Sequence, residues 1–291
     1  MTINADLVRN PYIDYQETVR EVFAQVLSRP AFPLSARLFS MACFAFEADA
    51  AVASDGPGFT EAKLADEVNK VADYVYERLW VEEFNGKSVD PERPMSMIQS
   101  LLLGRVRTCT TLFNQMIMAT WSEYITEKGS ARGGAPLLDI KSSKQEIRVK
   151  CADLTRQYVD RRDRLFAILG REIDHKLQDF CTRFILSREY STHDTHIACV
   201  QRLMLQVALL KYFLVSDPDL AVGIRRIDPG PSGNRSVTQE DRESLGRAVS
   251  IIIQRTECHL EQESNALGVL QRALLDQGMQ DLFHTALFVF F

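Results

Sequence analysis

Apolar residues recur at helical spacing along most of this chain, and no stretch keeps the strict alternation that marks a β-strand. The clearest apolar stripe follows Thr60, a residue type that can cap a helix. Its members stand at steps of four, three, four and four: Leu64, Val68, Val71, Val75 and Leu79. Residues 14–28 also have one apolar face, and Pro30 ends that stretch because proline cannot continue a helix. The pattern predicts an all-α fold.

The other apolar stretches predict further helices that differ in their burial. Residues 33–51 begin with a proline and are apolar on nearly all sides, which is typical of a helix packed between others. We therefore expect this segment to be the central core helix. Further helices are predicted over residues 95–125, 142–189 and 192–215, and a final pair of helices over residues 239–277. The stretch 142–189 forms either one very long helix or two collinear ones, and the whole predicts a multi-helix bundle of long amphipathic helices.

Glycine and proline are scarce, with 14 and 10 residues, and they gather at residues 55–58, 128–136 and 216–236. Because such clusters interrupt helices, the second of them is the expected boundary between two packed helical subdomains. These subdomains are residues 1–130 and 137–291, which can equally form one continuous domain. The third cluster predicts a loop.

Composition and charge narrow the class of protein. The chain has 291 residues, of which 46% are hydrophobic and 25% are charged, the balance of a water-soluble protein with a large core. A net charge of −5 argues against nucleic acid as a partner. The most apolar later stretch is interrupted by Arg202 and Lys211, and the N-terminus lacks the pattern of a signal peptide, so no membrane span is expected. Six cysteines stand singly, which fits reduced thiols in the cytoplasm or the nucleus, and we expect a cytoplasmic location.

The densest set of possible metal ligands lies between residues 172 and 196. Glu172 and His175 are three residues apart, as in the Glu-x-x-His element of metal sites in helical bundles, and His193 and His196 repeat that spacing. These four are the candidate metal ligands. A turn near Tyr190 would place the second pair opposite residues 184–188, not opposite His175, and no second Glu-x-x-His element occurs. The alternative is that the histidines are polar residues in the first turn of a helix that Ser191 or Thr192 caps.

One short segment resembles a catalytic motif. The sequence REYSTHDTHIACVQ, residues 188–201, is similar to the second catalytic box of the histidine acid phosphatases. The resemblance implies that His193 and Asp194 bind and protonate a phosphate ester, and they are the candidate catalytic residues. The nucleophile box of that family, Arg-His-Gly-x-Arg-x-Pro, does not occur in this sequence, and the helical pattern differs from the family's α/β fold.

A second candidate binding site lies just before the first helix of the final predicted pair. In GPSGNRS, residues 230–236, backbone N–H groups and Arg235 could hold an anion at the start of that helix. The segment lacks the Gly-Lys-Ser/Thr of a phosphate-binding loop, so a plain flexible loop is the alternative. The helix itself can begin with a capping box of Thr238 and Asp241.

Each catalytic pattern in this sequence lacks a member, so we expect a non-enzymatic protein that works through its helical surface. It would be an adaptor, a regulator or an assembly subunit that binds protein partners, or an oligomer that self-associates through residues 142–189 or the apolar tail 282–291. No cofactor is predicted. The alternative is a helical enzyme that holds a divalent metal within residues 172–196 and hydrolyses a phosphate ester or oxidises a small substrate. A third hypothesis is a pocket between helices for an apolar small molecule.

Overall fold

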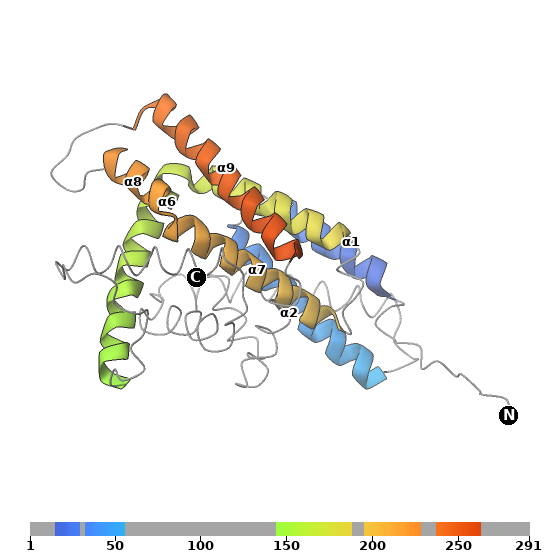
Figure 1. Ribbon diagram of the computed structural model, residues 1–291. Coiled ribbons are helices and arrows are strands. Elements are labelled where there is room, and N and C mark those ends of the chain that lie inside the picture. Colours follow the sequence, from blue (N-terminus) through green and yellow to red (C-terminus); the bar gives the residue numbers. More distant parts are fainter. Residues whose placement is uncertain (1–14, 30–32, 56–143, 188–194, 228–236, 263–291) are drawn as a thin grey trace. The chain divides into compact units, whose positions relative to one another are not determined.

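The computed structural model describes residues 15–29, 33–55, 144–187, 195–227 and 237–262 (Figure 1). These residues are 93% helical, with six helices and no strand among them, which confirms the predicted all-α fold. The helices are α1 (Gln16–Leu27), α2 (Leu34–Asp55), α6 (Lys144–Leu186), α7 (His196–Ser216), α8 (Pro218–Ile227) and α9 (Gln239–Gln262). The helices predicted over 60–79 and 95–125 lie outside the described residues, and so does the part of the predicted final helix pair that covers 263–277.

One prediction about local structure is wrong. The sequence predicts a loop over residues 216–236, but Pro218–Ile227 within them is helix α8. The Asp217 side chain accepts a hydrogen bond from the backbone N–H of Leu220 at 2.9 Å and so caps this helix. Pro218 occupies the first helical position, where its missing N–H costs nothing. The buried side chains then follow a helical stripe: Leu220, Ala221, Ile224 and Ile227.

The described chain divides into two compact units. The first unit contains α1, α2, the end of α6 from Leu177 and the start of α7 up to Val207. The second contains the earlier part of α6, the rest of α7 from Ala208, and helices α8 and α9. The subdomain boundary expected at residues 128–136 lies outside the described residues, so that division stays a prediction.

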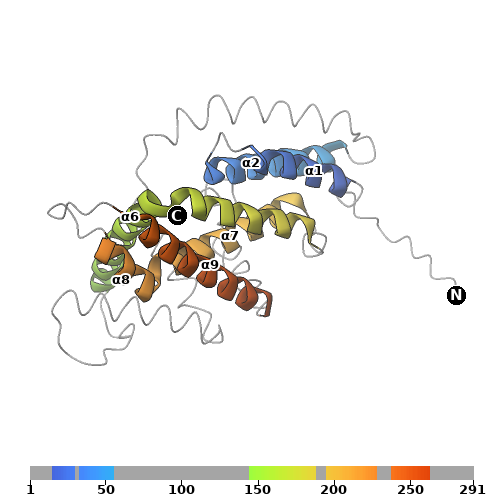
Figure 2. The same cartoon turned by 90° about the horizontal axis from the view of Figure 1, so that it is seen from above.

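Helix α2 forms the core of the first unit, as its apolar composition predicts. Almost every residue from Leu34 to Ala45 is buried, and so are Ala48, Asp49 and Val52. Helix α1 lies alongside α2 (Figure 2). It buries an apolar stripe of Val19, Phe23 and Leu27. The rings of Phe23 and Phe44 meet edge to face with centroids 5.9 Å apart, a favourable geometry for an aromatic pair.

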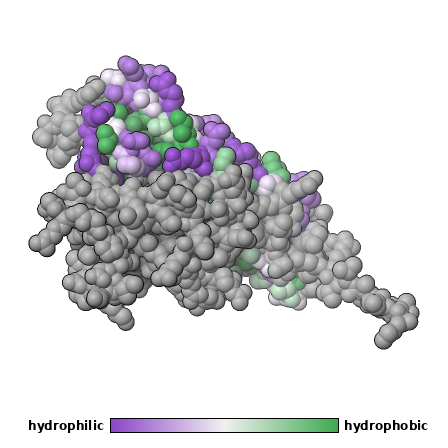
Figure 3. Space-filling model, viewed as in Figure 1, coloured by the Kyte–Doolittle hydropathy of each residue, from purple (hydrophilic) through white to green (hydrophobic). Residues whose placement is uncertain are grey.

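The second unit is held together by stripes at helical spacing on α6, α8 and α9. The buried stripe of α9 consists of Leu245, Val249, Ile253, Thr256 and Leu260. Helix α8 packs on α9, and Gly223 lies so close to Leu245 that an added Cβ would be 2.9 Å from a methyl carbon of that leucine. Figure 3 shows apolar residues between hydrophilic ones where α8 and α9 lie. The rings of Tyr158 on α6 and Tyr212 on α7 stack with centroids 6.1 Å apart.

Helix α6 is continuous over 43 residues but has a kink at Leu169. The backbone angles there are φ −125° and ψ 15°, which are not helical. The sequence leaves open whether this stretch is one helix or two, and a single kinked helix lies between those alternatives. The Arg242 guanidinium of α9 donates a hydrogen bond to the Ile168 carbonyl oxygen at 2.9 Å, directly before the kink. A kink disturbs the backbone hydrogen bonds within a helix. The Arg242 side chain therefore gives the Ile168 carbonyl oxygen a hydrogen-bond donor beside the kink.

Among the described residues, α7 is the one helix that is long and apolar enough to cross a bilayer. Its apolar window is 78% buried inside the protein, and a core helix has the same length and composition. Lys211 within it is also buried. The expectation that the chain has no membrane span therefore stays a prediction.

Candidate functional site

A buried polar contact in the first unit joins α2 to the start of α7. The Asp49 carboxylate accepts hydrogen bonds from the backbone N–H groups of His196 at 3.2 Å and Ile197 at 2.7 Å. The Thr195 hydroxyl oxygen accepts another from the Ala198 N–H at 3.2 Å. The first N–H groups of a helix have no partner within the helix, and its N-terminus carries a partial positive charge. A carboxylate from a distant helix thus satisfies both requirements.

We call the contact between Asp49 and the start of α7 the buried joint. Burial changes the pKa of both ionisable side chains there, Asp49 and His196. It raises the pKa of the Asp49 carboxyl from 3.8 to about 6, although the hydrogen bonds from Ile197 and His196 act in the opposite direction. Burial lowers the pKa of the His196 imidazole from 6.5 to about 4. At neutral pH the Asp49 side chain is therefore mostly ionised and the His196 side chain is neutral.

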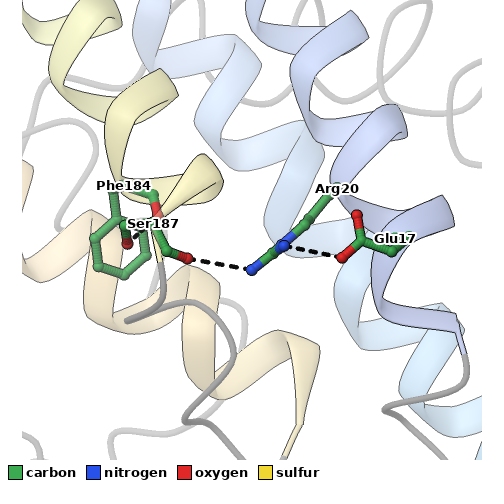
Figure 4. Close-up of polar contacts among 4 residues, drawn as sticks. All are labelled: Glu17, Arg20, Phe184 and Ser187. Carbon is green, nitrogen blue, oxygen red and sulfur yellow. Dashed lines mark hydrogen bonds and ion pairs between the residues drawn. The ribbon is translucent and has the colours of Figure 1, made fainter.

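Two arginines satisfy helix C-termini in the same unit. Arg20 of α1 donates to the Ser187 carbonyl oxygen at 3.1 Å, just after the end of α6, and pairs with Glu17 at 2.9 Å (Figure 4). Buried Arg37 of α2 donates to the Leu27 carbonyl oxygen, the last of α1. Carbonyl groups at a helix C-terminus attract cations, so each charge has the sign that its helix end favours. Arg20 thus links α1 to the end of α6, and Arg37 links α2 to the end of α1.

Arg37 also connects α2 to α6. Its guanidinium donates a second hydrogen bond, to the Gln178 side-chain oxygen at 2.8 Å. A buried charge is costly unless it has polar partners, and these two acceptors come from two different helices. Arg37 therefore ties three helices of the first unit to one point.

The structure describes only part of the predicted site. Glu172 and His175 are exposed on α6 in the second unit, and His196 is buried at the start of α7 in the first. His193, Asp194 and Arg235 lie outside the described residues. Within the described ranges no three His, Cys, Asp or Glu side chains form a group that could hold a metal ion. The metal, phosphatase-like and anion sites stay predictions.

The cysteines of the first unit lie in its core. Cys43, Cys181 and Cys199 are reduced thiols with buried side chains. Burial, with a smaller contribution from the Glu47 charge, raises the pKa of the Cys43 thiol to about 12. A thiol is nucleophilic as the thiolate, so Cys43 is unreactive near neutral pH. Cys258 on α9 is exposed.

Large apolar side chains are exposed in both units. In the first unit these are Phe46 on α2, 45% exposed, and Leu186 on α6, 67% exposed. In the second unit they are Val222 on α8, 44% exposed, and Ile251 on α9, 64% exposed. Each stands on a helix whose other large apolar side chains are mostly buried, so the packing within its unit does not account for it.

Sequence reasoning missed the residue at the centre of the buried joint. The one signal for Asp49 was its position within a helix that is otherwise apolar on nearly all sides. Its partners are 147 and 148 residues away, so no local spacing marks the contact. Comparison of the chain with protein-family models, with curated proteins and with solved structures found no match.

Proposed function

We propose that this chain is a non-enzymatic helical protein that works by binding other proteins, as an adaptor, a regulator or an assembly subunit of the cytoplasm. The exposure of large apolar side chains on helices of both units supports this proposal. Leu186 carries the most weight, because it is 67% exposed and lies at the end of α6. This helix is the segment expected from the sequence to mediate self-association. Apolar area removed from water by a partner stabilises a complex by about 25 cal/mol per Å².

Self-association can be tested with the full chain by sedimentation velocity over a wide range of concentrations. We expect a concentration-dependent dimer or higher oligomer, and we expect Leu186→Asn and Phe46→Asn to shift the equilibrium towards the monomer. Glu21→Asn, at an exposed position of α1, is the control for introducing asparagine. Circular dichroism confirms that each variant keeps its helices.

Two results together would contradict the proposal. One is a protein that stays monomeric at all concentrations. The other is a set of partner proteins, recovered by cross-linking, that neither these substitutions nor deletion of residues 282–291 changes. In that case the exposed apolar side chains and the apolar tail would have no role in association.

A further inference from the structure

An isoleucine between two arginines forms part of the outer face of α9. Ile251 is 64% exposed, and Arg247 and Arg255 stand four residues before and after it. Side chains four residues apart in a helix lie on the same face, one turn from each other. Both arginines are exposed as well. The three residues therefore form one short surface, which we call the α9 outer face.

Among the described residues of the second unit, α9 packs through a different face. The helix buries the stripe that contains Leu245, Val249 and Ile253, and a hydrophobic residue is not required on the opposite side. An exposed isoleucine leaves apolar area in contact with water, which a partner can remove.

The charges of the α9 outer face are also available. Within the part of the chain that the structure describes, neither Arg247 nor Arg255 makes a hydrogen bond or an ion pair. Arg242 of the same helix differs, because its guanidinium donates to the Ile168 carbonyl oxygen. Arginine binds carboxylates through two parallel N–H groups, so a free arginine beside an apolar side chain suits an acidic partner.

Helix α8 repeats the combination on a smaller scale. Val222 is 44% exposed, and Arg226, four residues later and on the same face, is exposed too. Helices α8 and α9 thus each have an exposed apolar side chain one turn from an exposed arginine.

We propose that the α9 outer face docks an acidic segment of a partner protein. An apolar side chain of the partner covers Ile251, and carboxylates on either side of it pair with Arg247 and Arg255. This inference rests on the proposed function and adds the location of one binding surface and the chemistry of its partner.

Two other classes of partner fit the surface less well. A helix that lies on a membrane turns its broad apolar stripe towards the lipid, but the broad stripe of α9 is buried in the protein. A nucleic acid would be repelled by Glu240 and Glu243, which are exposed on the same helix. A protein segment can place its carboxylates beside the arginines alone.

The test uses the full chain and a fluorescein-labelled synthetic helical peptide that carries one leucine, one glutamate a helical turn before it and one a turn after it, with glutamine and alanine elsewhere. A peptide with lysine in place of each glutamate is the charge control. Binding is followed by fluorescence anisotropy at low and high salt. We expect the acidic peptide to bind more tightly than the basic one, and we expect high salt to weaken its binding. Ile251→Asn and the pair Arg247→Glu with Arg255→Glu should each lower the affinity at least about tenfold.

Matched controls separate this surface from general charge and stickiness. Arg171→Glu reverses another exposed arginine of the second unit, and Leu186→Asn removes an exposed apolar side chain of the first. Neither should change peptide binding. Equal losses in Arg171→Glu and in the α9 variants would overturn the proposal, as would equal binding of the two peptides.

Two further measurements identify a different occupant. If the α9 variants abolish binding to vesicles of anionic phospholipid but not to the acidic peptide, the face binds a membrane and the proposal is wrong. If they abolish self-association in sedimentation and leave peptide binding unchanged, a second copy of the chain occupies it, and the proposal is again wrong. If only Leu186→Asn reduces self-association and the α9 variants change nothing, the docking site is disproved and the proposed function stands.

Discussion

The Asp49 carboxylate lies 2.7 Å from the backbone nitrogen of Ile197, a residue 148 positions further along the chain. The contact places a negative charge at the positive end of α7 and joins α7 to α2 inside the first unit. The pKa of Asp49 is nevertheless raised, because burial destabilises the ionised carboxylate more than the two backbone hydrogen bonds stabilise it. The buried joint therefore depends on the protonation state of Asp49 and is sensitive to pH.

Replacing Asp49 should change how the free energy of unfolding depends on pH. The folded protein binds the Asp49 proton with a pKa of about 6, above the value of 3.8 expected when unfolded. Between these values the folded state holds more protons, so the contribution of Asp49 to stability falls as pH rises from about 4 to about 6. We expect Asp49→Asn to gain stability over the wild type across this range, on the order of 2–3 kcal/mol. Urea unfolding at a series of pH values measures the difference.

Glu47→Gln is the matched control, because it removes an exposed carboxylate from the same helix. A difference between Asp49→Asn and the wild type that stays constant from pH 4 to pH 7 would show that the buried carboxyl does not titrate as described. Asp49→Ala adds a second measure, since it also leaves two N–H groups of α7 without their acceptor. It should be less stable than Asp49→Asn by about 1 kcal/mol.

His196 should give a pH dependence of the opposite sign. Its imidazole has a pKa of about 4 in the folded protein, below the value of 6.5 expected when unfolded. The unfolded state holds more protons between these values, so the contribution of His196 to stability is lost as pH falls from about 6.5 to about 4. We expect His196→Asn to lose less stability than the wild type on acidification, measured by the same unfolding series.

His175→Asn removes an exposed histidine from α6 and serves as the control for this series. Because Asp49 and His196 act in opposite directions over the same range of pH, the two effects partly cancel in the wild type. Each single substitution should therefore reveal the effect of the other residue. If His196→Asn and His175→Asn show the same change with pH, the buried histidine has no special part in acid sensitivity.

Local features of the sequence were sufficient to predict much of the fold. Thr238 and Asp241 form the expected capping box, in which the Thr238 hydroxyl accepts from the Asp241 N–H at 3.1 Å and the Asp241 carboxylate accepts from the Thr238 N–H at 3.1 Å. Such a contact spans three residues and depends on the local sequence alone. The exception was α8, because Pro218 and Gly223 belong to a cluster of residue types that is typical of a loop. A proline at the first position of a helix instead favours its start.

The buried joint could not be predicted in the same way. The contact between Asp49 and Ile197 depends on how α2 packs against α7, and no residue spacing in the sequence indicates that packing. The sequence predicts His196 either as a polar residue of a first helical turn or as a metal ligand. The structure does place it in the first turn of α7, but buried, at 4% exposure.

The bond between Arg242 and the kink of α6 should contribute measurably to stability. The guanidinium donates to the Ile168 carbonyl oxygen at 2.9 Å, next to the non-helical residue Leu169. Arg242→Ala leaves that carbonyl without this donor, and we expect a loss of about 1–2 kcal/mol in the free energy of unfolding. Arg247→Ala, on the outer face of the same helix, should cost less than about 0.5 kcal/mol. Urea unfolding compares the two, and equal losses would mean that the bond at the kink contributes nothing specific.

The close contact between α8 and α9 predicts opposite effects for the same substitution at two glycines. Alanine is favoured over glycine inside a helix by about 1 kcal/mol. At Gly246 a new Cβ would meet nothing within 4 Å, so Gly246→Ala should raise the free energy of unfolding by about that amount.

At Gly223 the new Cβ would lie 2.9 Å from a methyl carbon of Leu245, whose side chain is buried and has little room to move. Overpacking of this kind costs about 1–3 kcal/mol, which exceeds the gain in helix propensity, so Gly223→Ala should lower the stability. Leu245→Ala in the Gly223→Ala background removes the clashing methyl group, and the two substitutions should therefore cost less together than the sum of their separate effects. Thermal and urea unfolding of the four proteins of this cycle measure the coupling. Additive effects would show that α8 and α9 are not in close contact at this point.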